Sequence, residues 1–238
     1  MKLVTKSLER VFFAATNPMA EWLLRAHMRP NTLTTIAAIL VVVSAAAFAF
    51  GAIRWGGGLL LASGIVDTLD GQVARRGGMV SRFGAFYDST LDRVGDGATF
   101  IGIALYLLRA PDVARRVETA ALCMLAVLSS LLVSYARARA EGLGIECKVG
   151  IVQRAERLIA IGVPSVLVGA GPGGIVLQVI VAVLALLSTV TVVQRFVYVY
   201  RVTREPAAPA EAAAPGISEP VAPAEAAAPG ISESTERT

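Results

Sequence analysis

The stretch that decides the fold reads Asp67-Thr-Leu-Asp70-Gly71-Gln-Val-Ala74-Arg75, then eight residues, then Gly84-Ala-Phe-Tyr-Asp88-Ser-Thr-Leu-Asp92. Its two halves lie in apolar segments that a short basic turn connects. Asp67 and Asp70 are three residues apart, and Asp88 and Asp92 are four apart, so each pair occupies one face of a helix. The spacing therefore predicts an antiparallel helix pair whose four carboxylates converge on one cavity.

The composition of the chain is that of a membrane protein. Of the 238 residues, 55% are hydrophobic and only 17% are charged, and the mean hydropathy is +0.64. The charges form short clusters between long apolar runs, which predicts an all-α, polytopic membrane protein. The net charge of +4 does not indicate nucleic acid as a partner, because the chain has no groove-reading motif and no basic patch interleaved with aromatic residues.

Six apolar segments are each near the ~20 residues that a helix needs to cross a bilayer. They run approximately over residues 31–53, 55–74, 83–108, 117–138, 158–170 and 175–200. The fifth segment is short and ends at a turn, Gly171-Pro172-Gly173-Gly174. We therefore expect a domain of six transmembrane helices over residues 30–204.

Basic residues flank these segments unequally. Most arginines and lysines lie on one side, whereas the opposite side holds Arg54, Arg109, Arg115 and Arg116. The positive-inside rule then predicts a multi-pass protein of the cell membrane, with both termini and the four carboxylates on the cytoplasmic side.

Both ends of the chain differ from this six-helix domain. Residues 1–29 mix apolar and charged positions at helical spacing, which predicts an interfacial amphipathic helix broken near Pro18. A short cytosolic helix packed on the membrane domain is the alternative. At the other end, the sequence APAEAAAPGISE occurs twice, over residues 208–219 and 222–233. This composition predicts a disordered tail over residues 205–238.

Four carboxylates between apolar helices need positive charge nearby, because repulsion and desolvation would otherwise be large. Oxygen ligands favour hard divalent ions such as Mg²⁺ or Mn²⁺. Four carboxylates suit two ions, which in two-metal sites lie about 3.5–4 Å apart. The predicted metal ligands are Asp67, Asp70, Asp88 and Asp92.

Two alternatives to metal binding remain for these acids. They could form buried salt bridges with Arg75, Arg82 and Arg93. The chain could also be an ion-coupled membrane transporter, although transporters usually spread their charges over several helices and often have repeat symmetry.

The run from Asp67 to Asp92 follows the pattern D-x2-D-G-x2-A-R-x8-G-x3-D-x3-D, and it resembles the signature of the CDP-alcohol phosphotransferase family. The resemblance implies a membrane enzyme, usually a homodimer, that transfers a phosphatidyl group from CDP-diacylglycerol to an alcohol and releases CMP. It implies that the first three aspartates ligate metal and that Asp92 is the general base, which also touches the second metal. The contacts that it implies for the CDP-linked lipid are Asn31, Thr34, Asp67, Gly71, Arg75 and Ser81.

A second basic cluster bears on the identity of the alcohol. It reads Ser134-Tyr-Ala-Arg137-Ala-Arg139-Ala-Glu141 and Gly150-Ile-Val-Gln-Arg154-Ala-Glu156-Arg157. These arginines either anchor the chain at the cytoplasmic surface or hold a phosphate through bidentate hydrogen bonds.

This pattern resembles that of the bacterial phosphatidylinositol phosphate synthases, which implies a phosphorylated polyol, inositol 3-phosphate, as the acceptor. Arg137 and Ala155 stand where the resemblance leads us to expect Lys and Pro. Glycerol 3-phosphate, which would give phosphatidylglycerol phosphate, therefore remains an alternative acceptor. By the same resemblance, the acceptor phosphate would be held by Arg137, Arg139 and either Arg154 or Arg157.

We expect a chain truncated after Glu205 to insert, fold and turn over like the full chain, because the repeats lack residues that could form a core. The specific activities of the two purified proteins would test this directly. A large loss on truncation would mean that the tail takes part in folding or turnover.

Overall fold

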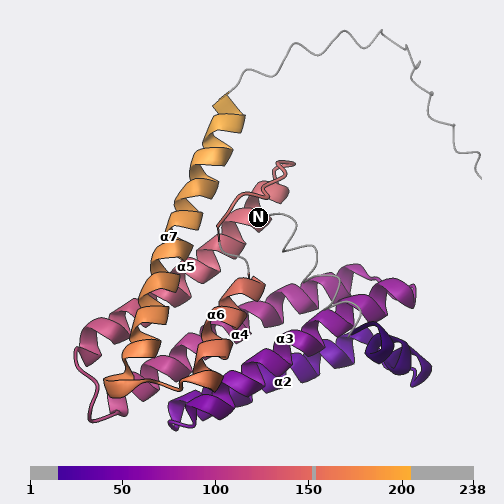
Figure 1. Ribbon diagram of the computed structural model, residues 1–238. Helices are drawn as coiled ribbons and strands as arrows, with labels where there is room; N and C mark the ends of the chain where they lie inside the picture. Colours follow the sequence, from indigo (N-terminus) through magenta and orange to yellow (C-terminus); the bar gives the residue numbers. More distant parts are fainter. Residues whose placement is uncertain (1–15, 152–153, 205–238) are drawn as a thin grey trace, which may run out of the picture. The chain divides into compact units, whose positions relative to one another are not determined.

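The structure is a computed structural model that describes residues 16–151 and 154–204, in which all regular structure is helical (Figure 1). After a helical stretch over residues 16–25, the elements in chain order are α2 (Pro30–Ala49), α3 (Ile53–Arg76), α4 (Arg82–Arg109), α5 (Arg116–Glu141), α6 (Arg154–Leu167), the 3₁₀ turn η1 (Pro172–Gly174) and α7 (Ile175–Arg204). The all-α prediction is confirmed. Each predicted apolar segment corresponds to one of the helices α2 to α7, with ends that agree within about one helical turn.

Within residues 16–151 and 154–204, three helices are long and apolar enough to cross a membrane. They are α2, α5 and the continuous stretch Pro172–Arg204 that contains α7. The other three depart from a simple apolar span for visible reasons, because α3 and α4 carry the aspartates and α6 has only 14 residues with Pro164 inside it.

The first predicted segment, residues 31–53, corresponds to α2, which ends earlier, at Ala49. Gly51 adopts a left-handed conformation with φ 82°, so the chain turns between Ala49 and Ile53 instead of continuing as one segment. Beyond the turn, α3 lies close to α2. A Cβ added to Gly56 would come within 2.9 Å of the Phe48 ring, so this approach depends on glycine.

The α3 and α4 helices are held together mainly through α2, which packs against both of them. Gly102 of α4 lies so close to α2 that an added Cβ would come within 2.2 Å of the carbonyl oxygen of Ala45. Among the described helices, α3 and α4 make little close backbone contact with each other. The predicted pair, α3 and α4, therefore does not pack closely as two backbones, and α2 packs against both helices. Contact between α3 and α4 is made by side chains.

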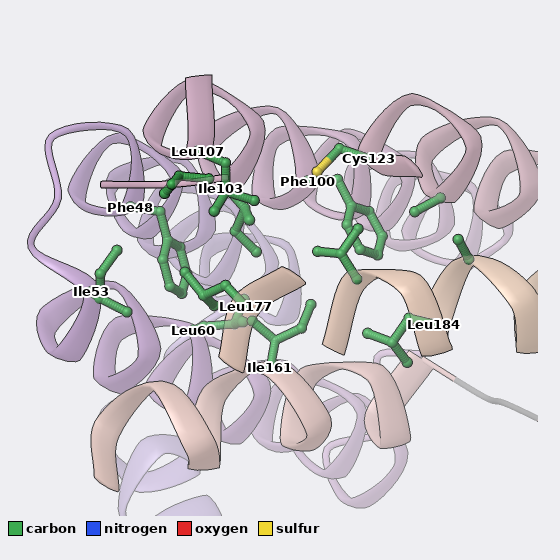
Figure 2. Close-up of a cluster of buried hydrophobic side chains, with 14 of the residues drawn as sticks. Phe48, Ile53, Leu60, Phe100, Ile103, Leu107, Cys123, Ile161, Leu177 and Leu184 are labelled. Atoms are coloured by element: carbon green, nitrogen blue, oxygen red, sulfur yellow. The ribbon is translucent and has the colours of Figure 1, made fainter. Parts of the chain in front are cut away.

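The remaining helices extend this arrangement. α5 packs on α4 and runs beside α7, and α6 packs on α3 (Figure 1). The main apolar core lies between these helices, and Figure 2 shows its side chains. Its largest fully buried side chains include Phe48, Leu60, Phe100, Ile103, Leu107 and Leu177. The residues of α3 in this core come from its first half and those of α4 from its second half, so the aspartates lie toward the opposite end.

The helical stretch 16–25 covers that opposite end. Its Ala20 and Leu23 are buried in a small cluster with Leu33, Leu69 and Val73, whereas Trp22 is exposed. This described part therefore packs one face on α2 and α3, and its position at the membrane interface or in the cytosol stays a prediction. The rest of the predicted interfacial helix, residues 1–15, and the predicted tail, residues 205–238, lie outside the described residues.

The contact between α3 and α6 gives a test of the packing. A Cβ added to Gly57 would lie 2.6 Å from Cβ of Ser165 and 2.8 Å from the carbonyl oxygen of Gly162, whereas one added to Gly58 would meet nothing within 4 Å. We expect Gly57→Ala to lower the midpoint of thermal unfolding in detergent, because overpacking of this kind costs about 1–3 kcal/mol. The matched Gly58→Ala variant should unfold at or above the normal midpoint. Equal midpoints for the two variants would contradict this packing.

Candidate active site

The turn between α3 and α4 places the second pair of aspartates. Ser81 precedes α4 and its hydroxyl oxygen accepts a hydrogen bond from the backbone N–H of Gly84, at 3.0 Å. This N-cap satisfies one of the backbone donors that a helix start leaves free. α4 therefore begins at Arg82, and Asp88 and Asp92 follow on one face of its first turns.

Three of the four predicted carboxylates meet in space. Oxygen atoms of Asp67, Asp70 and Asp88 all lie within 4.8 Å of one another. Asp70 is buried, and its Oδ2 accepts a hydrogen bond from Thr34 Oγ1 of α2 at 2.7 Å. Three oxygen donors at this spacing fit a hard divalent cation, and the hydroxyl of Thr34 orients one of them.

Asp92 lies beside this group and shares a partner with it. Arg154 Nη1, from the first turn of α6, is 2.8 Å from Asp67 Oδ2 and 2.8 Å from Asp92 Oδ1. Arg93 is also near, with Nη1 3.8 Å from Asp92 Oδ2. The salt-bridge alternative was therefore partly right about pairing, although the principal partner is Arg154 rather than Arg75, Arg82 or Arg93.

The predicted contacts of the CDP-linked lipid surround the same end of the helices. An added Cβ at Gly84 would lie 3.3 Å from Asn31 Oδ1, and one at Gly71 would lie 3.1 Å from Arg75 Nη1. Asn31 and Arg75 thus stand at the two glycines of the signature. Thr34 and Ser81 have structural partners here, Asp70 and the start of α4. Their predicted roles toward a nucleotide stay predictions.

The four predicted acceptor arginines fall into two groups. Arg137 and Arg139 are exposed on the last turns of α5, and Arg137 Nε is 2.8 Å from Glu141 Oε1. On α6, Arg157 is buried, and its Nη2 lies 2.5 Å from Asp96 Oδ2. Of the two α6 arginines left open by the sequence, Arg154 is the one that reaches the clustered carboxylates.

Sequence reasoning missed two charged residues, Asp96 and Arg195. Asp96 follows Asp92 by four residues, so the helical spacing that identified the other aspartates also contained it. Arg195 interrupts the apolar run of α7, and it is buried, with Nε 3.0 Å from the carbonyl oxygen of Val149. A lone arginine within a membrane segment was the signal for it.

One protein family matches nearly the whole helical domain. The profile of the CDP-alcohol phosphatidyltransferase family matches residues 27–207. The chain belongs to this family. It is therefore a membrane-associated transferase of phospholipid biosynthesis, and the transporter alternative is wrong.

Two curated relatives resemble the transferase over most of their length. The archaetidylinositol phosphate synthase of Methanothermobacter thermautotrophicus is 42% identical in an alignment of 177 residues that covers 72% of this chain and 84% of the relative. The phosphatidylinositol phosphate synthase of Cutibacterium acnes is 40% identical in an alignment of 193 residues that covers 78% of this chain and 92% of the relative.

Solved structures of the Mycobacterium tuberculosis phosphatidylinositol phosphate synthase have the same fold. The structure with CDP-DAG bound matches with a TM-score of 0.69 at 32% identity, over 78% of this chain and 93% of that one. Another contains manganese and citrate and matches with the same TM-score, over 78% of this chain and 88% of that one. Together with the clustered carboxylates, the manganese complex confirms the predicted cofactor class, Mg²⁺ or Mn²⁺.

The hydrogen bond from Thr34 to Asp70 gives a prediction about metal affinity. Thr34→Val keeps the shape of the side chain but removes the donor, so Mn²⁺ should bind about 10–100-fold more weakly. Thr35→Val is the matched control, because the Thr35 hydroxyl contacts the Asn31 carbonyl and Tyr87 rather than a carboxylate. Electron paramagnetic resonance of free Mn²⁺ measures both affinities. Equal affinities would show that Thr34 does not support the site.

Proposed function

We propose that this enzyme transfers the phosphatidyl group of CDP-diacylglycerol to inositol 3-phosphate, which gives phosphatidylinositol phosphate and CMP. The proposal rests on one observation, namely that its relatives are named for products with the same head group. The archaeal and bacterial relatives differ in the lipid that they are named for, but both are named for an inositol phosphate head group. This favours inositol phosphate over glycerol 3-phosphate.

The aspartates of α3 and α4 would hold two divalent ions between the helices. Asp67, Asp70 and Asp88 would hold the first ion, and Asp92 would complete the second. When bound, the ions would neutralise the CDP diphosphate and stabilise the charge that develops on the departing CMP.

Asp92 is proposed as the general base. Its carboxylate would take the proton of the acceptor hydroxyl, whose oxygen then forms a bond to the β-phosphorus while the bond from that phosphorus to the CMP oxygen breaks. The contact of Asp92 Oδ1 with Arg154 fixes the direction of the carboxylate. Asn31, Gly71, Arg75 and Ser81 would position the nucleotide, whereas Thr34 would act through Asp70.

The phosphate of the acceptor would bind between α5 and α6. Arg137 and Arg139 approach from the exposed end of α5, and Arg154 faces the carboxylates from α6. The buried Arg195 of α7 donates hydrogen bonds to the carbonyl oxygens of Val133 on α5 and Val149 before α6, so it adds positive charge near this region. Arg157 is committed to Asp96 and would not contact the acceptor directly.

The placement in the membrane is part of the proposal. All six helices α2 to α7 would cross the bilayer as the domain 30–204, with both termini and the aspartates at the cytoplasmic side. The helical stretch 16–25 would lie at the membrane interface, and the predictions for residues 1–15 and 205–238 lie outside the described residues. By resemblance to its family, the enzyme would act as a homodimer.

An acceptor panel tests the proposed reaction. Purified protein in mixed micelles is given CDP-diacylglycerol, Mg²⁺ and either inositol 3-phosphate, free inositol or glycerol 3-phosphate, and the lipid product is identified by mass. Inositol 3-phosphate should be the best acceptor, and Asp70→Asn should abolish CMP release as the matched inactive control. A preference for glycerol 3-phosphate would replace the inositol assignment but retain a phosphate pocket.

The arginines of α5 give a second, quantitative expectation. Arg137→Ala and Arg139→Ala should each raise the acceptor KM about 10–100-fold, because a charge-assisted hydrogen bond contributes roughly 1.5–3 kcal/mol. The KM for CDP-diacylglycerol should change much less, since the metal ions and Arg75 would hold that substrate. An unchanged acceptor KM in both variants would mean that these arginines only anchor the helix end.

A further inference from the structure

A second charged pair lies one helical turn deeper than Arg154 and Asp92. Arg157 Nη2 of α6 is 2.5 Å from Asp96 Oδ2 of α4. The same oxygen accepts a hydrogen bond from Ser130 Oγ of α5, at 2.9 Å. The side chains are nearly closed off, with Arg157 5% and Asp96 9% exposed. Three helices therefore meet at one buried ion pair outside the family signature.

The deep pair repeats the geometry of the pair in the site. Asp92 and Asp96 are four residues apart on α4, and Arg154 and Arg157 are three apart on α6, so each set occupies one helix face. The two ion pairs therefore join α4 and α6 at successive helical turns. The side chains of the Arg154–Asp92 pair are partly exposed, at 20% and 18%, whereas those of the Arg157–Asp96 pair are nearly buried.

The two ion pairs matter because they join the first turn of α6 to α4 beyond the part of α6 that enters the apolar core. α6 packs mainly on α3, and in the described part of the chain α4 and α6 make little close backbone contact. The first turn of α6, which carries Arg154, is thus linked to α4 through side chains. Of those side chains, the Arg157–Asp96 pair is the one that Ser130 braces from a third helix.

We propose that Asp96 and Arg157 are positioning residues, which fix the first turn of α6 so that Arg154 stands between Asp67 and Asp92. Neither residue touches a substrate in this assignment. Their effect on turnover rests on the proposed function, because it runs through the role of Arg154 toward the acceptor phosphate.

A purely structural role of the Arg157–Asp96 pair would give different results from a role in positioning Arg154. Removal of one partner of a buried ion pair leaves an uncompensated charge and destabilises the protein, whereas removal of both charges together is often neutral for stability. If the pair only compensates charge, a doubly neutral variant should recover both stability and kinetics. If the pair positions Arg154, stability should recover while acceptor binding stays impaired.

The decisive variants are Asp96→Asn, Arg157→Gln and the double variant. Each single variant should lower the midpoint of thermal unfolding, and the double variant should recover most of that loss. In the double variant, the acceptor KM should remain about tenfold or more above normal, because displacement of a substrate-orienting group by about 1 Å has effects of that order or larger. The KM for CDP-diacylglycerol should change much less. Recovery of a normal acceptor KM, or an equal rise in both KM values, would overturn the proposal.

A conservative variant provides the test if the double variant does not fold. Arg157→Lys retains the buried positive charge but loses the planar guanidinium that contacts Asp96. It should keep a near-normal unfolding midpoint and still raise the acceptor KM. A normal acceptor KM in this variant would overturn the proposal.

The rate at which a chemical probe modifies Arg154 reports on the exposure of its side chain and requires no enzymatic turnover. Phenylglyoxal modifies accessible guanidinium groups, and mass spectrometry of peptides follows Arg154 alone. Modification of Arg154 should be faster in the double variant or in Arg157→Lys than in the unmutated enzyme, and an unchanged rate would overturn the proposal. A different result would show that the proposed function is wrong: the unmutated enzyme would form no lipid product from inositol 3-phosphate.

Discussion

Arg154 Nη1 lies 2.8 Å from a carboxylate oxygen of Asp67 on α3 and 2.8 Å from one of Asp92 on α4. This contact joins two helices whose backbones do not pack closely. Carboxylates at this density are stable away from bulk water only with positive charge beside them. The arrangement of α6 follows from that requirement, because its first turn supplies Arg154 to the cluster and Arg157 to Asp96.

The glycines explain how the rest of the molecule leaves room for this charge. Gly56, Gly57 and Gly102 permit close approaches at the α2–α3, α3–α6 and α2–α4 contacts, and the large apolar side chains gather at the same end (Figure 2). These close approaches lie toward one end of α3 and α4, whereas the clustered aspartates lie toward the other. The main apolar core and the candidate site are thus at opposite ends of the same helices.

The sequence predicted the described helices and the clustered carboxylates largely from local patterns. Apolar runs located the described helices α2 to α7, and spacings of three and four residues placed Asp67 with Asp70, and Asp88 with Asp92, on shared helix faces. The short turn between the two segments then predicted that the two pairs converge. Spacing does not specify which helix packs on which, so the packing of α2 against both α3 and α4 was not foreseen. Arg154 could not be assigned to Asp67 and Asp92 for the same reason, since a long stretch of chain separates them. Asp96 was missed although its spacing followed the rule already in use.

The shortness of α6 has a consequence for how two dissimilar substrates meet. A helix of 14 residues is about 21 Å long, whereas the hydrocarbon core of a bilayer is ~30 Å thick. In the proposed topology, α6 is therefore too short to cross the hydrocarbon core by itself, and its charged first turn would lie below the level of the lipid head groups. A polar acceptor would then have to bind below the head groups to reach Arg154, close to the level of the acyl chains of its reaction partner.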